Sequence, residues 1–271
     1  MARLDRLTIG PQVANLPHKA TGPMTEEQRQ RTIRLKLSRM TDQPGRAIPT
    51  GFRAIDRALG IGGLPRGSIV ELYGPAACGK STLAAQIVAS IQGQGSSAAW
   101  IDSEHAFDPA RARWLGVAIE KMPVLCPESA EQALEIARRL AGSHGLDALV
   151  IDSAAALVPE LELESAIGEA GQGLYGRVLA SGLRRLAATV RKTSACVLIL
   201  NQTRTRRDAS GEDAEISAGG SALKLYSAAR LALYPVTNRR IRLRVLKNKA
   251  AAAFTEGELE WRQDGRFVES P

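Results

Sequence analysis

A glycine-rich segment in the first third of the chain has the spacing of a phosphate-binding loop. Its sequence is Gly74-Pro75-Ala76-Ala77-Cys78-Gly79-Lys80-Ser81, followed by Thr82. Glycines allow backbone N–H groups to approach phosphate oxygens, and a following helix adds the partial positive charge of its N-terminus. In this pattern the lysine reaches the β- and γ-phosphates, and the serine hydroxyl ligates Mg²⁺. The spacing therefore predicts a site for ATP and Mg²⁺; an ordinary glycine turn before a helix is the alternative.

Polar side chains follow three further apolar runs. Asp152 follows ALVI, and a carboxylate in that place holds Mg²⁺ directly or through water. Glu104 follows AAWIDS, where a carboxylate orients and deprotonates an attacking water. Gln202 ends SACVLILNQ, and its uncharged amide hydrogen-bonds a γ-phosphate without adding negative charge. Taken singly, Asp152 also fits a capping residue, and Glu104 and Gln202 also fit ordinary surface side chains.

Strand and helix patterns alternate along the part of the chain that carries these residues. The runs SIVELYG, SSAAWIDSE, DALVIDS and SACVLILNQ are typical of strands, and helices are expected at 80–92, 129–142 and 173–192. This alternation predicts an α/β fold with a mostly parallel central sheet and helices on both faces. After Ser221, the runs AARLALYP, RRIRLRVLKN and GELEWRQDG predict antiparallel strands added at the C-terminal side. Since parallel strands end at one edge of a sheet, we expect the three polar residues to lie beside the phosphate loop.

The beginning of the chain differs from the rest. Residues 1–23 mix proline, glycine and polar residues and predict a loose arm. Thr25, followed by two glutamates, is typical of a helix start, and a basic helix is expected to about Met40. Its apolar residues form no wide stripe, so it is expected to pack on a neighbour. We therefore divide the chain into an arm and helix at 1–45, for oligomerisation or partner binding, and a core at 46–271.

The composition is that of a basic globular protein. The 271 residues carry a net charge of +8, which favours a polyanionic partner or a nucleotide, and 44% hydrophobic residues suffice for one large core. The three cysteines lie far apart, so their spacing indicates neither a disulfide framework nor a metal site. No apolar run approaches the ~18 residues of a membrane span, and no apolar leader is present. We expect a cytoplasmic protein without membrane contact.

Seven segments, in this order and spacing, resemble the bacterial RecA recombinase family. They are GGLPRGSIVELYGP, IDSEHAFDPARARWLGV, EQALEIARRL, VIDSAAALVPELELE, ILNQTR, AGGSALKLYSAARL and KNKAAAAF. The match runs from about Gly51 to Phe254. The resemblance implies a RecA-type P-loop NTPase fold that binds ATP and Mg²⁺.

The resemblance also implies roles at matching positions. Glu104 would be the ATPase base, and Gln202 would couple the γ-phosphate to a DNA-binding loop. Asp108 would lie near the adenine. Lys247 and Lys249 would reach the ATP of an adjacent subunit in a filament and stabilise the transition state. From the residues alone, these two lysines also fit a solvated basic strand end.

Two segments, 164–173 and 203–219, correspond to the mobile DNA-binding loops of the family. The candidate DNA-binding residues are Arg204, Arg206, Arg207, Gly219 and Gly220. Arginines on a flexible loop suit phosphate contacts with single-stranded DNA. The alternative is a solvent-exposed charged loop, whose acidic residues partly cancel the positive field.

Some positions depart from the family pattern. Arg111 stands where the family stacks a tyrosine on adenine, so it is expected near the base, with a changed nucleotide affinity or a changed base preference. Gln172 occupies a methionine position of the first loop, and the second loop has no aromatic or large apolar residue before Ile216. The chain ends at Pro271, where the family continues into a C-terminal domain, which weighs against full strand exchange.

Two functions stay open. The first is a DNA-dependent ATPase that acts on single-stranded DNA in recombination, DNA repair and the SOS response, in its own filament or a RecA filament. The alternative is a RecA paralogue of the ImuA type, resembled by the segment IPTGF, that binds RecA and a translesion DNA polymerase and hydrolyses ATP weakly. ImuA proteins often have degraded P-loops, whereas this motif is intact. A circadian or archaeal-type relative is disfavoured because the matching segments are those of bacterial RecA.

Overall fold

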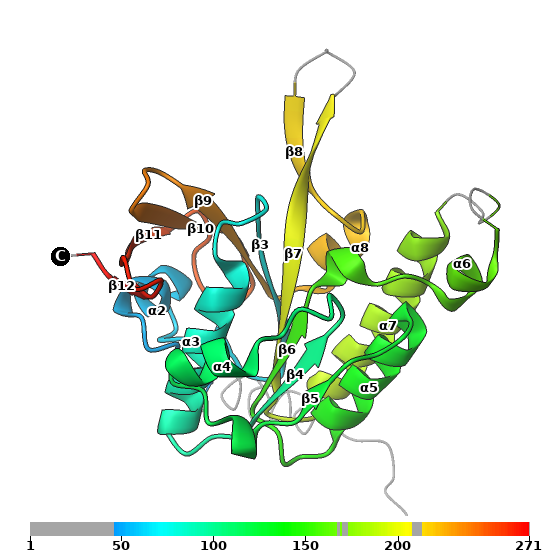
Figure 1. The fold of residues 1–271 in the computed structure, drawn as a ribbon, viewed down its shortest axis with the longest axis horizontal. Helices are drawn as coiled ribbons and strands as arrows, with labels where there is room; N and C mark the ends of the chain where they lie inside the picture. The colour runs from blue at the N-terminus through cyan, green and yellow to red at the C-terminus, as the bar shows by residue number, and fades with distance from the viewer. Residues whose placement is uncertain (1–45, 167–168, 170–172, 208–212, 271) are drawn as a thin grey trace, which may run out of the picture. The chain divides into compact units, whose positions relative to one another are not determined.

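The computed structural model describes residues 46–166, 169, 173–207 and 213–270 (Figure 1). The arm and basic helix expected at 1–45 lie outside these residues. The helices are α2 (Arg53–Leu59), α3 (Lys80–Gly93), α4 (Pro109–Trp114), α5 (Ala130–Gly142), α6 (Glu160–Glu164), α7 (Leu174–Val190) and α8 (Ser221–Tyr226). The strands are β1 (Ala47–Ile48), β2 (Leu64–Pro65), β3 (Ser68–Gly74), β4 (Ala98–Asp102), β5 (Val124–Leu125), β6 (Ala148–Asp152), β7 (Cys196–Arg207), β8 (Asp213–Ser217), β9 (Ala229–Pro235), β10 (Arg240–Asn248), β11 (Glu256–Trp261) and β12 (Phe267–Glu269).

One large sheet organises the part of the chain that the structure describes. Its strand order is β12-β11-β10-β9-β3-β7-β6-β4-β5, with β8 paired to β7. The six strands from β9 to β5 in this order run parallel, and β10, β11 and β12 extend the sheet by antiparallel pairing. The predicted α/β fold is confirmed.

One of the three C-terminal runs was predicted with the wrong direction. The run AARLALYP contains β9, which pairs with β3 in parallel rather than antiparallel. The reason is the connection before it: α8 returns the chain to the amino end of β3, where the Ala228 N–H donates to the Ile69 carbonyl at 2.7 Å. The antiparallel extension therefore begins one strand later, at β10.

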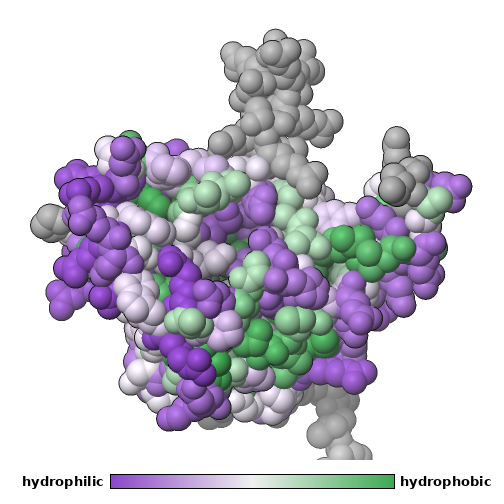
Figure 2. Space-filling model, viewed as in Figure 1, coloured by the Kyte–Doolittle hydropathy of each residue, from purple (hydrophilic) through white to green (hydrophobic). Residues whose placement is uncertain are grey.

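Helices cover both faces of the sheet because strand side chains alternate in direction. Val70 and Leu72 of β3 belong to a buried cluster with Leu83 of α3. Ile69 belongs to the cluster on the other face, with Leu183 of α7 and apolar residues of α5. Figure 1 shows α3 and α4 on one side of the parallel strands and α5 and α7 on the other. With the apolar side chains between these layers, the outer surface seen in Figure 2 is largely hydrophilic, with smaller apolar patches.

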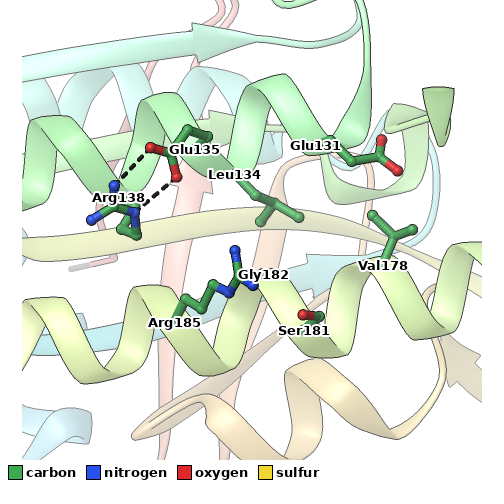
Figure 3. A pocket seen from close by; sticks show the side chains of 8 residues that line it. All are labelled: Glu131, Leu134, Glu135, Arg138, Val178, Ser181, Gly182 and Arg185. Carbon is green, nitrogen blue, oxygen red and sulfur yellow. Dashed lines mark hydrogen bonds and ion pairs between the residues drawn. The ribbon is translucent and has the colours of Figure 1, made fainter.

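Helices α5 and α7 pack closely along one face of the sheet. α5 begins as the sequence predicts, since the Ser129 side chain accepts a hydrogen bond from the Gln132 N–H. On α7, Gly182 faces Leu134 of α5, and a Cβ on this glycine would lie 2.4 Å from Leu134 Cδ1. Figure 3 shows the shallow groove between the two helices, with Glu135 paired to Arg138 at its rim. The missing side chain at Gly182 is therefore what allows this helix pair to approach.

The segment 203–219 differs from the loop that was predicted. β7 continues through Arg207, and β8 returns beside it in antiparallel register from Thr203 opposite Ser217 to Arg207 opposite Asp213. Figure 1 shows these strands projecting beyond the main sheet. The β-branched residues Thr203 and Thr205 favour extended backbone, and pairing satisfies backbone N–H and C=O groups that a loop would leave to water. We call β7 from Thr203 onward, together with β8, the hairpin; residues 208–212 lie outside the described ranges.

The helix contact yields a stability test. We expect Gly182→Ala to lower the free energy of unfolding by about 1–3 kcal/mol, because overpacking against Leu134 outweighs the better helix propensity of alanine. Gly176→Ala is the matched control on the same helix, since no atom of another segment lies within 4 Å of its Cβ position. Urea denaturation measures both. Equal effects at the two positions would contradict the close approach of α5 and α7.

Candidate functional site

The register of the parallel strands brings the predicted polar residues to one edge of the sheet. Gly74 at the end of β3 is opposite Gln202 on β7, and Asp102 at the end of β4 is opposite Asp152 on β6. The chain then leaves β3 into the phosphate loop and α3. The carboxyl edge is therefore where the loop, the two aspartates and Gln202 meet.

The phosphate loop depends on two glycines for its shape. Gly79 has a φ of 87°, and a Cβ there would lie 2.5 Å from the Trp261 ring and 2.7 Å from the Phe267 ring. A Cβ on Gly74 would lie 2.4 Å from the Leu233 carbonyl oxygen. Neither position has space for a side chain. At Gly79 the positive φ also disfavours any residue other than glycine. The last residue of β11 and the first residue of β12 thus pack their aromatic rings against the loop.

Lys80 points into the loop that precedes it. Its Nζ donates to the Pro75 carbonyl at 2.7 Å and to the Gly74 carbonyl at 3.2 Å. The Cys78 sulfur lies 3.8 Å from the same nitrogen, and burial raises the pKa of that thiol. The lysine charge is thus held at the position where the phosphate chain of a nucleotide would lie, and the thiol beside it stays protonated.

Ser81 and Asp152, the predicted Mg²⁺ ligands, are in contact. The Ser81 side chain hydrogen-bonds Asp152, whose pKa is raised to about 6 by burial and by the negative charges of Glu104 and Asp102. The Ser81 hydrogen bond and the Lys80 charge act in the opposite direction. A carboxylate that water solvates so poorly gains most from a cation beside it.

The oxygen donors at this edge fit Mg²⁺. Magnesium prefers hydroxyl, carboxylate, phosphate and water oxygens and seldom sits in an all-protein cage. The described residues contain no cluster of three or more histidine, cysteine or acidic side chains that would form such a cage. Ser81 and Asp152 would therefore hold the ion together with phosphate oxygens and water.

Glu104 and Gln202, predicted separately from two strands, lie beside each other. Gln202 Nε2 donates to Glu104 Oε1 at 3.5 Å. The same carboxylate oxygen accepts a hydrogen bond from Ser153 Oγ at 2.5 Å. The Glu104 N–H donates to the Asp152 carbonyl at 3.3 Å, which fixes its backbone against β6. The carboxylate of Glu104 is exposed, so an attacking water reaches it from solvent.

Ser153 was missed from the sequence. It is buried to 1% exposure, yet its hydroxyl is aimed at Glu104. A serine after a strand is too common to single out. Its role follows only from the contact between β6 and the segment after β4, which sequence spacing does not reveal.

Asp108 and Arg111 lie on one short helix next to the phosphate loop. Asp108 Oδ1 caps α4 by accepting hydrogen bonds from the Ala110 and Arg111 N–H groups at 2.8 and 3.1 Å. Arg111 Nη2 donates to Thr82 Oγ1 at 3.4 Å and to the Gly265 carbonyl at 3.5 Å. Arg111 thus reaches the start of α3, and Asp108 caps α4; their places near the base of a nucleotide stay predictions.

Lys247 and Lys249 lie away from the phosphate loop of their own chain. Lys247 pairs in register with Arg230 of β9, which is opposite Glu71 of β3, about 10 Å along the strand from Gly74. Lys247 Nζ donates to the Lys224 and Leu225 carbonyls at 2.5 and 3.2 Å. Burial, with the charge of Lys249, lowers the pKa of Lys247. The two lysines are therefore not part of the site that the other predicted residues form.

Comparison with known proteins identifies the family. A family model described as the RecA N-terminal domain matches residues 24–264. The protein named Protein RecA of Thermus thermophilus is 43% identical over 236 residues, which cover 83% of this chain and 69% of the relative. Protein RecA of Geobacter sulfurreducens is 40% identical over 262 residues, which cover 88% and 77%. This chain belongs to the RecA family. The resemblance of its seven segments is thus confirmed, and with it a RecA-like role in recombination and repair.

The DNA-binding residues expected for a RecA-family chain fall at the hairpin. Arg204, Arg206 and Arg207 are on the outgoing strand β7. Gly219 and Gly220, just after β8, have φ angles of 85° and 67°. A Cβ on Gly219 would also lie 2.6 Å from Leu179 Cδ2, so this glycine lets the return strand turn close to α7.

The first expected DNA-binding segment is only partly described. α6 ends at Glu164, and residues 167–168 and 170–172, Gln172 among them, lie outside the described ranges. Among the helices that are described in this RecA-family chain, none is long and apolar enough to cross a membrane.

Asp152 predicts a pH dependence of stability. Between the ordinary pKa of 3.8 and about 6, the folded chain binds a proton that the unfolded chain has released. Stability therefore falls as the pH rises through this window. We expect Asp152→Asn to remove this fall and to raise the free energy of unfolding of the nucleotide-free protein near pH 7 by on the order of 2 kcal/mol. Urea denaturation from about pH 4 to about pH 7 measures this difference; parallel curves for wild type and variant would contradict it.

Proposed function

We propose that this RecA-family chain is a single-stranded-DNA-dependent ATPase that acts in recombination, DNA repair and the SOS response. The observation that carries the proposal is the contact of Gln202 with Glu104. Gln202 lies at the base of the hairpin, and Glu104 lies beside the phosphate loop. One hydrogen bond thus joins the expected base of the hydrolysis reaction to the expected DNA-binding element.

The site residues support a simple division of work in hydrolysis of ATP to ADP and phosphate. Lys80 and the loop N–H groups hold the β- and γ-phosphates. A Mg²⁺ ion held by Ser81 and Asp152 would neutralise charge that develops on the phosphate oxygens. Glu104 accepts a proton from the water that attacks the γ-phosphorus. Ser153 keeps the Glu104 carboxylate oriented, since its hydroxyl donates to Oε1.

Gln202 supplies the link to DNA. Its Nε2 reaches Glu104 at 3.5 Å, a long hydrogen bond that a small movement of β7 would make or break. DNA bound along the hairpin would set the position of β7, with Arg204, Arg206 and Arg207 as the phosphate contacts. Stimulation of hydrolysis by DNA is therefore expected to pass through Gln202.

Lys247 and Lys249 support self-association as part of the same proposal. They lie apart from the loop of their own chain, and partial burial with neighbouring positive charges destabilises the Lys247 cation. An anion from a second molecule would stabilise that cation. We therefore propose that both lysines act on the ATP of an adjacent subunit in a filament.

Steady-state ATP hydrolysis by the purified protein, with and without single-stranded DNA, tests the proposal. We expect strong stimulation by DNA. ATP binding with little turnover in either condition would contradict it and favour a nucleotide-gated accessory of RecA and a translesion polymerase.

Glu104→Gln separates chemistry from binding. Glutamine keeps an oxygen that accepts from Ser153 but cannot take up a proton, so DNA-stimulated turnover should fall at least about 100-fold. ATP affinity should change little because Glu104 is exposed beside the loop. Hydrolysis and equilibrium ATP binding measure the two effects. Glu120→Gln is the control, because it makes the same substitution in the exposed ion pair of Glu120 with Arg113. Equal turnover of the two variants would remove Glu104 from the mechanism.

Replacing Arg204, Arg206 and Arg207 together with alanine tests the DNA contacts. We expect weaker binding of single-stranded DNA and a log–log salt slope that is shallower by about 2, because three phosphate contacts would be lost. Fluorescence anisotropy at a series of salt concentrations measures the slope.

A control variant carries the same loss of charge elsewhere. Arg184, Arg185 and Arg191 are exposed and lie toward the end of α7, which leads to the amino edge of the sheet. Their replacement with alanine should leave the slope unchanged. A slope that responds equally to both triple variants would mean that general charge, and not the hairpin, determines binding.

A further inference from the structure

A buried ion pair lies in the sheet and takes no part in the phosphate site. Glu71 of β3 is fully buried, and the Arg230 side chain of β9 is 10% exposed. The two residues are opposite each other in the parallel ladder, and Arg230 Nε donates to Glu71 Oε2. Removing both charges from water costs several kcal/mol each, so such a pair contributes little net stability compared with apolar residues of the same size. Stability therefore does not explain why this ion pair lies within the sheet.

The pair is extended by two further residues to the base of the hairpin. Asn201 Nδ2 donates to Glu71 Oε1 and to the Ala218 carbonyl, both at 2.9 Å. Arg230 Nη2 donates to Ser217 Oγ at 2.9 Å. Glu71, Arg230, Asn201 and Ser217 form what we call the Glu71 network. It joins β3, β7 and β9 to the last residue of β8.

Each end of the Glu71 network adjoins a functional element. The Arg230 guanidinium lies over the Tyr73 ring at 4.6 Å, and Tyr73 immediately precedes the first glycine of the phosphate loop. At the other end, Asn201 Oδ1 accepts from the N–H of Gln202 at 2.9 Å. The strand that carries the phosphate loop, β7 and the end of β8 are thus held by one connected set of hydrogen bonds, of which those made by Glu71 and Arg230 are charge-assisted.

We propose that Arg230 is a positioning residue that couples nucleotide binding to the hairpin through Glu71 and Ser217. A shift of β3 when the phosphate loop binds ATP is passed to Ser217 because Arg230 holds both at fixed distances. The bridge from Glu71 through Arg230 to Ser217 does not pass through the contact between Gln202 and Glu104, although Asn201 of the network adjoins Gln202. That the hairpin binds DNA rests on the proposed function. The coupling between the phosphate loop and the hairpin does not depend on it.

The side-chain chemistry supports a role that only arginine fills. A guanidinium offers five N–H donors in a fixed fork, so it holds Glu71 and Ser217 at the same time. An ammonium is a point charge on a flexible stem and would pair with Glu71 without reaching Ser217 in a fixed geometry. Arg230→Lys therefore keeps the buried charge balanced and removes the bridge, although it also changes the contact with the Tyr73 ring; Ser217→Ala removes the bridge and leaves that contact in place.

Hydrogen exchange tests the coupling without DNA or hydrolysis. The exchange rates of backbone N–H groups at 213–217 are measured with and without a non-hydrolysable ATP analogue and Mg²⁺. In wild type the analogue should slow exchange in this strand. In Ser217→Ala and in Arg230→Lys that slowing should fall by about tenfold, the equivalent of one hydrogen bond to a charged group. Ser217→Thr keeps the hydroxyl and should restore it.

Controls separate coupling from damage to the fold. Ser143→Ala removes a serine hydroxyl at the end of α5, where it donates to the Leu140 carbonyl, and should leave the slowing unchanged. Analogue affinity is measured for every variant, so that all are compared at saturation. Because Ser217→Ala removes one partly buried hydroxyl, it tests the bridge even if Arg230→Lys fails to fold.

The outcomes distinguish this inference from the proposed function. Equal slowing in wild type and Ser217→Ala, or no slowing in wild type with the analogue bound, overturns the coupling by Arg230. Loss of the slowing in Ser217→Ala with rescue by Ser217→Thr supports it. If wild type shows the slowing but single-stranded DNA neither binds nor stimulates hydrolysis, the proposed function fails while the coupling stands.

Discussion

The parallel register of β3, β7, β6 and β4 is the constraint on which the candidate site depends. Hydrogen bonds between these strands fix where each one ends, and they bring Gly74, Gln202, Asp152 and Asp102 to the same edge. None of these residues is near another in the sequence. A slip of one residue in any strand would turn its buried side chains to the wrong face, so the packing of two apolar layers holds the register that the chemistry needs. The geometry of the site therefore depends on the packing of the apolar core.

The charged side chains along that edge differ in how far they are buried, and their expected roles differ accordingly. Asp152 is largely shielded from water, which raises its pKa and prepares it for a cation. Glu104, two residues beyond β4, is exposed and held by Ser153, which suits an exchange of protons with water. Lys80 is buried among carbonyl oxygens that partly compensate its charge. One edge thus contains a cation-binding carboxylate, a water-accessible carboxylate and a phosphate-binding lysine in different environments.

The local features of the sequence predicted most of this arrangement. A phosphate loop is a contiguous motif, and the acids that follow buried strands could be placed at its edge by topology alone. What escaped prediction depends on contacts between distant residues. Arg230 and Glu71 are 159 positions apart, and a charged residue within an apolar strand gives no sign of its partner. The segment 203–219 was predicted as a loop because it corresponds to a mobile loop of the family that the sequence resembles; the structure instead pairs residues 203–207 with 213–217 as antiparallel strands.

This edge of the sheet is proposed to bind ATP together with Mg²⁺ through the phosphate loop. Isothermal titration of ATP into wild type and Lys80→Ala, each with Mg²⁺ and with a chelator, tests it most directly. We expect binding to wild type that is stronger with Mg²⁺, and a loss of most of that affinity in Lys80→Ala, because the charge that holds the β- and γ-phosphates is gone. Equal affinity of the two proteins for ATP, or binding to wild type that is indifferent to Mg²⁺, would contradict it.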